Sequence, residues 1–304
     1  MAKIVIALGG NALGNDLKEQ DSALTHSAQI IASLVKDGHD VIITHGNGPQ
    51  VGKIHQVMNT QLEIPLHVSV AMSQGYIGFD LVRKLEHALH LEGVHVPVDY
   101  VLTMVEVDPH DKAFSHPTKP IGGFMNEALA LELVKQGVPV VEDSGRGYRR
   151  VVASPKPKHI TNLKSIQDAM QKHHVVVCAG GGGIPVVHTP HGYEGVEAVI
   201  DKDSASALLA KELDVDVLFI LTAVEKVAVY YGTPKQRWLS TMSISETHQF
   251  IKEGHFAPGS MLPKVEAALT FVSGAKNKTT IITLLDKASE ALKGETGTRI
   301  VSEV

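Results

Sequence analysis

The sequence has one cysteine and few aromatic residues: Cys178 is the only thiol, and Phe, Trp and Tyr together make up 5% of 304 residues. A single cysteine excludes an intrachain disulfide, which fits a reducing compartment. No apolar run reaches the roughly 18 residues that a membrane-spanning helix needs. The N-terminal apolar run breaks at glycine before it attains the length of a signal sequence. We therefore expect a cytoplasmic protein without a membrane span.

The chain also lacks an excess of positive charge. It carries 28 Lys and Arg against 33 Asp and Glu, for a formal net charge of -5, so nothing favours nucleic acid or an anionic membrane as a partner. A local basic cluster at 146–158 has only Tyr148 as a stacking aromatic, and salt bridges to Glu142 and Asp143, or a partner contact, are preferred over nucleic acid. The 17 histidines are scattered without a known ligand spacing, so we predict no metal site.

Short apolar runs alternate with helical patterns along the chain. We predict strands at 4–8, 40–45, 96–105, 175–178, 215–221 and 280–285, and helices at 21–36, 70–92, 126–135, 204–212, 245–252 and 265–272. Such alternation is typical of an α/β sandwich with a mostly parallel sheet. We predict an N-terminal lobe at 1–165 and a C-terminal lobe at 166–304. Prolines crowd the segment 108–157, which predicts an elaborated loop or a small subdomain that projects from the sheet, as a mobile lid would.

Three glycine-rich turns, at 9–10, 46–48 and 180–183, each follow a predicted strand. Any one of them could simply be a tight connection between a strand and a helix. Three at the same edge of one sheet could supply several backbone N–H groups to an anionic ligand, with helix N-termini adding partial positive charge. The segment 46–53 differs from a P-loop, because it has one residue too many before Lys53 and Ile54 follows where a hydroxyl is needed.

Three lysines lie at predicted loops or junctions between elements. Lys119 stands between Thr118 and Pro120, Lys202 stands between two aspartates where a strand runs into a helix, and Lys264 follows a proline at the start of a helix. A single lysine is most often a solvated surface group. Three at such positions indicate a cationic cage for a transferring phosphoryl group, since this reaction depends on positioning and charge neutralisation. Asp203 would hold the lysines apart and oriented, or would cap the helix that follows, or both.

Eight segments together resemble carbamate kinase, a member of the amino acid kinase family. They occur in that family's order and run from the N-terminus to past residue 260: ALGGNA (7–12), HGNGPQVG (45–52), PTKPIG (117–122), EDSGRGYRR (142–150), SPKP (154–157), GGGGIPVV (180–187), AVIDKD (198–203) and GHFAPGSMLPK (254–264). Related kinases carry a lysine just before the first Gly-Gly, where this chain has Ala7 and Leu8. In carbamate kinases a lysine from the projecting subdomain takes that role, and Lys119 matches it.

The resemblance implies an α/β fold, a three-layer αβα sandwich with a mostly parallel central sheet, and a cytoplasmic homodimer of arginine metabolism. It implies that ATP and carbamate are interconverted with ADP and carbamoyl phosphate, with Mg²⁺ arriving on the nucleotide. The implied catalytic residues are Lys119, Lys202, Asp203 and Lys264. Those implied to hold carbamoyl phosphate and the γ-phosphate are Gly9, Gly10, Asn11, Gly46, Asn47 and Gly48. Those implied to bind the nucleotide are Gly181, Gly182, Thr222, Ala223, Val224, Tyr230 and Met261.

Two residues depart from the resemblance, both in the projecting segment. His116 stands where the family commonly has Asn, and Tyr148 stands where it often has Trp. One alternative is therefore a kinase of the same fold that acts on another small anionic acceptor. A second alternative is a nucleotide-binding regulator without turnover, although such a module would not need the lysines.

Overall fold

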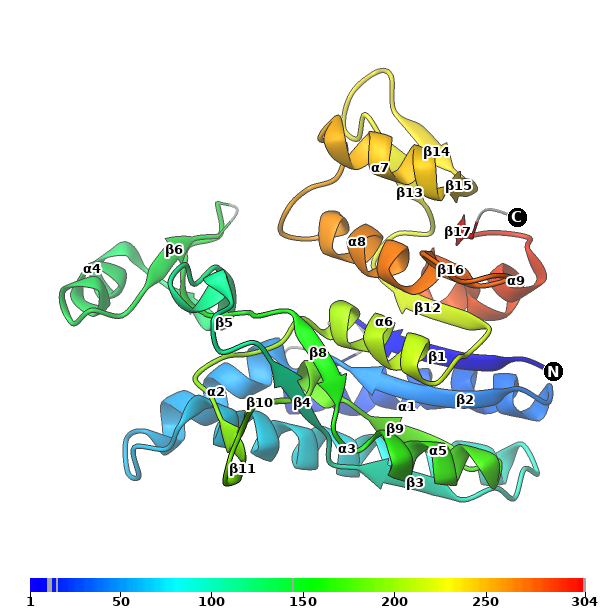
Figure 1. Ribbon diagram of the computed structural model, residues 1–304, viewed down its shortest axis with the longest axis horizontal. Helices are drawn as coiled ribbons and strands as arrows, with labels where there is room; N and C mark the ends of the chain where they lie inside the picture. Colours follow the sequence, from blue (N-terminus) through cyan, green and yellow to red (C-terminus); the bar gives the residue numbers. More distant parts are fainter. Residues whose placement is uncertain (10–12, 15, 144, 303–304) are drawn as a thin grey trace.

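A central sheet of eight strands organises the computed structural model, which describes residues 1–9, 13–14, 16–143 and 145–302 (Figure 1). All neighbouring pairs in it are parallel except β16 with β17. The predicted mostly parallel sheet is thereby confirmed. In spatial order the strands are β15 (Thr241–Ser243), β17 (Thr298–Val301), β16 (Thr279–Thr283), β12 (Val217–Leu221), β1 (Lys3–Leu8), β2 (Asp40–His45), β9 (Val175–Cys178) and β3 (Val98–Val101).

Helices cover both faces of this sheet, because its strands are apolar on both sides. In β1, Ile4 and Ile6 pack against one helical layer, whereas Val5 packs against the other. This alternation follows the two-residue period of a strand and gives the three predicted layers. On the first face lie α1 (Leu17–Lys36), α3 (Leu66–Leu91) and α9 (Ala288–Lys293); on the second lie α5 (Leu163–Gln171), α6 (Lys202–Glu212) and α8 (Met261–Val272).

The proline-rich segment forms the predicted projection. An antiparallel sheet of β5 (Lys119–Met125), β7 (Tyr148–Val152) and β6 (Val140–Glu142) carries α4 (Glu127–Lys135) away from the central sheet (Figure 1). It is attached through β5, which packs on α2 (Gly48–Met58). A second sheet contains, in order, β11 (Gly192–Gly195), β10 (Ile184–Thr189), β4 (Met104–Val107) and β8 (Pro157–Ile160). We call the segment 119–152 the projecting subdomain.

The predicted strand at 96–105 is wrong, because the chain divides it between two sheets. It forms β3 in the central sheet and β4 in the second one, with Thr103 between them. The Gln74 side chain bonds both backbone groups of Thr103, accepting from its N–H and donating to its carbonyl at 3.0 Å each. These bonds replace ladder bonds at the junction and allow the chain to change sheets.

The remaining elements lie in the C-terminal half. The hairpin of β13 (Val227–Val229) and β14 (Arg237–Leu239) precedes α7 (Ile244–Lys252), and a short 3₁₀ helix, η4, spans Leu285–Lys287. β9 follows the predicted lobe boundary in sequence but pairs with β2 and β3, which precede it. One sheet therefore runs through both halves, and the division into lobes stays a prediction. No described helix is both long and apolar enough to cross a bilayer.

Candidate active site

A cavity of about 630 Å³ opens at the carboxyl ends of three central strands. β1 ends at Leu8, β2 at His45 and β12 at Leu221, and the residues that follow each of them line the cavity. Ligands of α/β proteins bind at this edge, because the strand-to-helix turns meet there. Its lining includes eleven of the seventeen predicted site residues: Gly9, Gly46, Asn47, Gly48, Lys119, Gly181, Lys202, Asp203, Thr222, Ala223 and Lys264.

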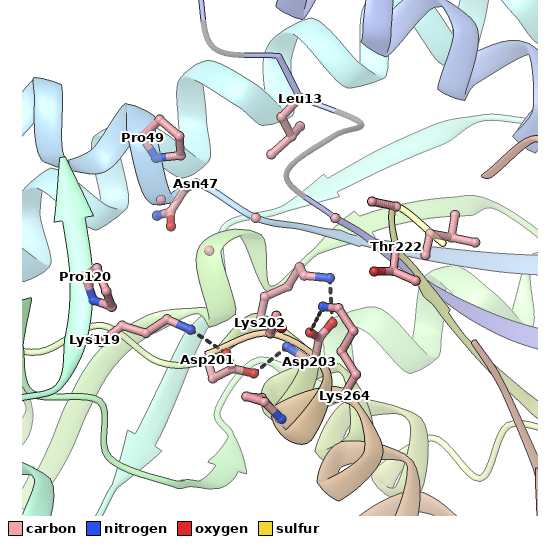
Figure 2. Close-up of a pocket in the computed structure, with 18 of the residues that line it drawn as sticks. Leu13, Asn47, Pro49, Lys119, Pro120, Asp201, Lys202, Asp203, Thr222 and Lys264 are labelled. Atoms are coloured by element: carbon pink, nitrogen blue, oxygen red, sulfur yellow. Dashed lines mark hydrogen bonds and ion pairs between the residues drawn. The ribbon is translucent and has the colours of Figure 1, made fainter. Parts of the chain in front are cut away.

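Asp203 joins two of the predicted lysines inside this cavity (Figure 2). Lys202 Nζ lies 2.6 Å from one of its carboxylate oxygens and Lys264 Nζ lies 2.7 Å from the other. Lys202 and Asp203 stand in the first turn of α6, and Lys264 stands in the first turn of α8. The Asp203 side chain is only 5% exposed, so both ion pairs form largely out of water.

Burial and charge act in opposite directions on these groups. Burial alone raises the pKa of Asp203, but the charges and hydrogen bonds of Lys202 and Lys264 outweigh it, and the pKa lies well below its usual range. For Lys202, burial lowers the pKa, the neighbouring Asp203 opposes the shift, and the like charge of Lys264 adds to it. Asp203 is thus ionised, and its negative charge favours the protonated form of the buried Lys202.

The cap of α6 is Asp201, which sequence reasoning did not assign. Its side chain accepts hydrogen bonds from the backbone N–H groups of Asp203 and Ser204, at 3.0 and 3.1 Å. The alternative interpretation of Asp203 as the N-cap is therefore wrong, because Asp203 already lies within the helix. The run Asp201-Lys202-Asp203 at a strand-to-helix junction was the available signal, since the first aspartate of such a run is placed to cap.

The projecting subdomain delivers the third lysine. Lys119 is the first residue of β5, and its Nζ lies 2.5 Å from the second carboxylate oxygen of Asp201 (Figure 2). The structure therefore brings all four predicted catalytic residues to one cavity. Their roles stay predictions.

The glycine turns line the same cavity as the lysines, and Lys202 Nζ lies 3.4 Å from the carbonyl oxygen of Ala7, just before the first turn. Gly9, Gly46 and Gly48 line it, whereas Gly10 and Asn11 lie outside the described residues. A Cβ on Gly9 would stand 2.6 Å from the carbonyl oxygen of Leu221, so only glycine fits there without a shift. Asn47 precedes α2, and its side-chain amide donates to Ser73 Oγ at 2.8 Å.

The predicted nucleotide residues are only partly brought together. Gly181, Thr222 and Ala223 line the cavity, but Gly182, Val224, Tyr230 and Met261 lie outside its lining. Gly182 is buried with φ +87°, and a Cβ there would meet the Ile200 carbonyl oxygen at 2.3 Å, which explains its glycine by close packing. Tyr230 is 46% exposed and contacts the His255 ring edge-on, with centroids 4.3 Å apart.

Other lining residues carry charge that sequence reasoning did not place there. Arg149 of β7 lines the cavity and donates to Asp143 at 3.2 Å and to the Gly122 carbonyl at 3.0 Å, which confirms the predicted salt bridge to Asp143. His26 of α1 and Asp286 of η4 form a hydrogen bond at the cavity. Within the described part of the chain, no group of three or more His, Cys, Asp or Glu is arranged to hold a metal ion.

Comparison with known proteins gives full-length matches. The profile of the amino acid kinase family matches residues 2–283. A carbamate kinase-like protein of Escherichia coli is 50% identical over 98% of each chain. The carbamate kinase of Clostridium perfringens is 47% identical over 98% of this chain and 99% of that one. A solved structure of carbamate kinase from Giardia lamblia bound to AMP-PNP is 40% identical over 99% of each chain, with a TM-score of 0.90.

Proposed function

This chain belongs to the amino acid kinase family, and from its likeness to carbamate kinases we propose that it transfers a phosphoryl group between ATP and carbamate. The products are ADP and carbamoyl phosphate, and the reaction is reversible. The observation that carries the proposal is the charge cluster of Lys202, Asp203 and Lys264, which lines one cavity together with the turns at Gly9 and Gly46.

The ammonium and backbone N–H groups of this cavity suit the chemistry of phosphoryl transfer. An oxygen of carbamate forms a bond to the γ-phosphorus while the bond from that phosphorus to the bridging oxygen of ADP breaks. Carbamate is already an anionic nucleophile, so no general base has to remove a proton. The obstacle is repulsion between an anionic acceptor and an anionic donor, which clustered ammonium groups and backbone N–H groups reduce.

We assign roles to the predicted residues on this basis. Lys119, Lys202 and Lys264 neutralise the phosphoryl oxygens, and Asp203 orients two of the lysines. The turns hold carbamoyl phosphate and the γ-phosphate through Gly9, Gly10, Asn11, Gly46, Asn47 and Gly48. The nucleotide lies in the C-terminal half, along Gly181, Gly182, Thr222, Ala223, Val224, Tyr230 and Met261.

Mg²⁺ enters, on this proposal, as part of the nucleotide substrate. The cavity carboxylates Asp201 and Asp203 each bond a lysine, and Asp286 bonds His26. Their oxygens are therefore largely engaged, and the phosphate oxygens of ATP or ADP are the ligands that remain for the ion.

We further propose that the protein is a cytoplasmic homodimer. An apolar stripe, formed by Val68, Met72 and Phe79, runs along the exposed side of α3, and Phe79 is 65% exposed. Apolar side chains at these helical spacings would be buried by a second copy of the same helix. The fully buried Cys178 cannot pair within the chain, which fits a reducing compartment.

The direct test is ATP formation from Mg-ADP and carbamoyl phosphate, with acetyl phosphate as a parallel donor. We expect rapid ATP formation from carbamoyl phosphate. Lys264→Ala should lower kcat by roughly 10²–10³-fold, the scale of losing one stabilising donor, while weakening ADP binding only modestly. Lys164→Ala removes an exposed lysine paired with Asp168 and serves as the matched control, with unchanged kcat.

Two outcomes would contradict the proposal. If ADP binds but no ATP forms from carbamoyl phosphate, the acceptor is another small anion. If Lys264→Ala retains full turnover, Lys264 does not belong to the catalytic cluster.

A further inference from the structure

We propose that Asp201 is a positioning residue, which holds the ammonium group of Lys119 against the start of α6 so that the projecting subdomain presents this lysine to the transferring phosphoryl group. The inference rests on the proposed function and adds a residue to its site. The two residues are 82 positions apart in the chain and come from different parts of the fold.

The two carboxylate oxygens of Asp201 have separate tasks. Oδ1 accepts from the backbone N–H groups of Asp203 and Ser204, which caps the helix. Oδ2 accepts from Lys119 Nζ at 2.5 Å. Because the cap fixes the carboxylate in the frame of α6, the ammonium bonded to it is fixed in the same frame as Lys202 and Asp203.

This anchoring matters because a lysine side chain is long and flexible. Fixing its ammonium group costs the lysine side chain much of its rotamer entropy, and a charge-assisted hydrogen bond offsets that cost before substrate arrives. The Lys119 side chain is 37% exposed, so without a partner it could turn toward solvent. When an anionic phosphoryl group enters, the ammonium can move from Oδ2 to a phosphoryl oxygen while Oδ1 continues to cap the helix.

Charge balance gives Asp201 a second effect. The described cluster contains three ammonium groups, on Lys119, Lys202 and Lys264, and two carboxylates, on Asp201 and Asp203. The difference, three minus two, leaves one positive charge. Asp201 therefore lessens the repulsion that would otherwise drive Lys119 away from the other two lysines.

Asp201→Asn separates the two tasks of this side chain. Asparagine caps helices about as well as aspartate, so the helix start is retained while the charge that holds Lys119 is removed. Asp16 caps α1 in the same way, accepting from the N–H groups of Lys18 and Glu19 at 2.9 and 2.8 Å. Asp16→Asn is the matched control.

We expect Asp201→Asn to lower kcat for ATP formation by about 10–100-fold, in line with the loss of a charge-assisted bond that orients a catalytic group. The KM for ADP should stay within about twofold, whereas the KM for carbamoyl phosphate should rise. Asp16→Asn should change none of these values. The decisive measurement is a double-mutant cycle: in a Lys119→Ala background, Asp201→Asn should lower kcat by no more than about twofold, because its partner is already gone.

The proposal is overturned if Asp201→Asn leaves kcat unchanged, or if the same loss appears in the Lys119→Ala background. Failure of the proposed function would be visible separately, as a wild-type protein that forms no ATP. In that case, amide hydrogen exchange tests the anchoring of Lys119 without requiring turnover. Faster exchange over 119–125 in Asp201→Asn than in wild type would support the anchoring, and unchanged exchange would overturn it.

Discussion

At the scale of residues, the charge balance of the site depends on one buried carboxylate. Asp203 bonds Lys202 and Lys264 with its two oxygens, and it is more deeply buried than either partner. Burying one ammonium group without a partner would be costly, and burying two side by side would add their repulsion. The paired arrangement keeps positive charge at the cavity wall, where anionic substrates need it.

Replacing this carboxylate should shift the pH dependence of turnover. The pKa of Lys202 is lowered by burial, while Asp203 opposes the shift. Since the protonated lysine is the active form, kcat should fall as pH rises toward that lowered pKa. Asp203→Asn removes the opposing charge, so the pKa falls further and the alkaline limb moves to lower pH. The measurement is kcat for ATP formation against pH in both proteins.

Asp214→Asn is the control for that profile. Asp214 pairs with Lys278 at 2.7 Å, outside the cavity lining, and its side chain is exposed. Its substitution should leave the alkaline limb in place. A limb that stays fixed in Asp203→Asn, or that moves to higher pH, would contradict the assigned role of Lys202.

At the scale of elements, a close backbone contact attaches the projecting subdomain to α2. Gly52 of α2 faces Gly122 of β5, and a Cβ on Gly52 would stand 2.1 Å from the Gly122 Cα. Any side chain there would have to push β5 away from α2. This contact lies three residues from Lys119 along β5, so the helix sets where the lysine enters the cavity.

Gly52→Ala should therefore disturb both stability and catalysis. We expect a loss of about 1–3 kcal/mol in the free energy of unfolding, the usual cost of overpacking, together with a higher KM for carbamoyl phosphate. Denaturant unfolding and steady-state kinetics measure the two effects. Gly123→Ala is the matched control, because a Cβ on this neighbouring glycine meets open space. Equal behaviour of the two variants would refute the contact's importance.

At the scale of the whole molecule, the apolar stripe on α3 bears on the proposed assembly of two copies. Val68, Met72 and Phe79 lie on a helix whose opposite side packs into the core through Ile77, Leu81 and Leu85 among others. An exposed apolar stripe on a long, well-packed helix is typical of an interface between subunits.

We expect the wild-type protein to sediment as a dimer at low micromolar concentration. The double variant Met72→Glu and Phe79→Glu should sediment as a monomer, since two like charges would be buried against their copies. Leu131→Glu, which alters an exposed leucine on α4, should remain dimeric. A monomeric wild-type protein would overturn the proposed assembly.

Much of the fold could be predicted because short, local sequence patterns encode its strands and helices. Buried strands appear as short apolar runs, and the bounds of β2 and β9 agree with the prediction at 40–45 and 175–178. The helix starts were less accurate: α8 begins at Met261 rather than 265, because Pro263 fits the first turn of a helix. The edge strand β15 and its neighbour β17 were not predicted, since four residues or fewer carry little periodic signal.

The sequence by itself determined the sandwich, the glycine turns and the identity of the four charged residues, because residue type and spacing along a strand or turn encode each of them. Only the tertiary structure decided which charges meet. Lys119 and Asp201 are 82 positions apart, and Lys264 and Asp203 are 61 apart. Likewise, only packing placed Tyr230 and Met261 outside the cavity lining. Contacts at such separations depend on how the sheet and the projecting subdomain pack against one another, and no local sequence pattern encodes that packing.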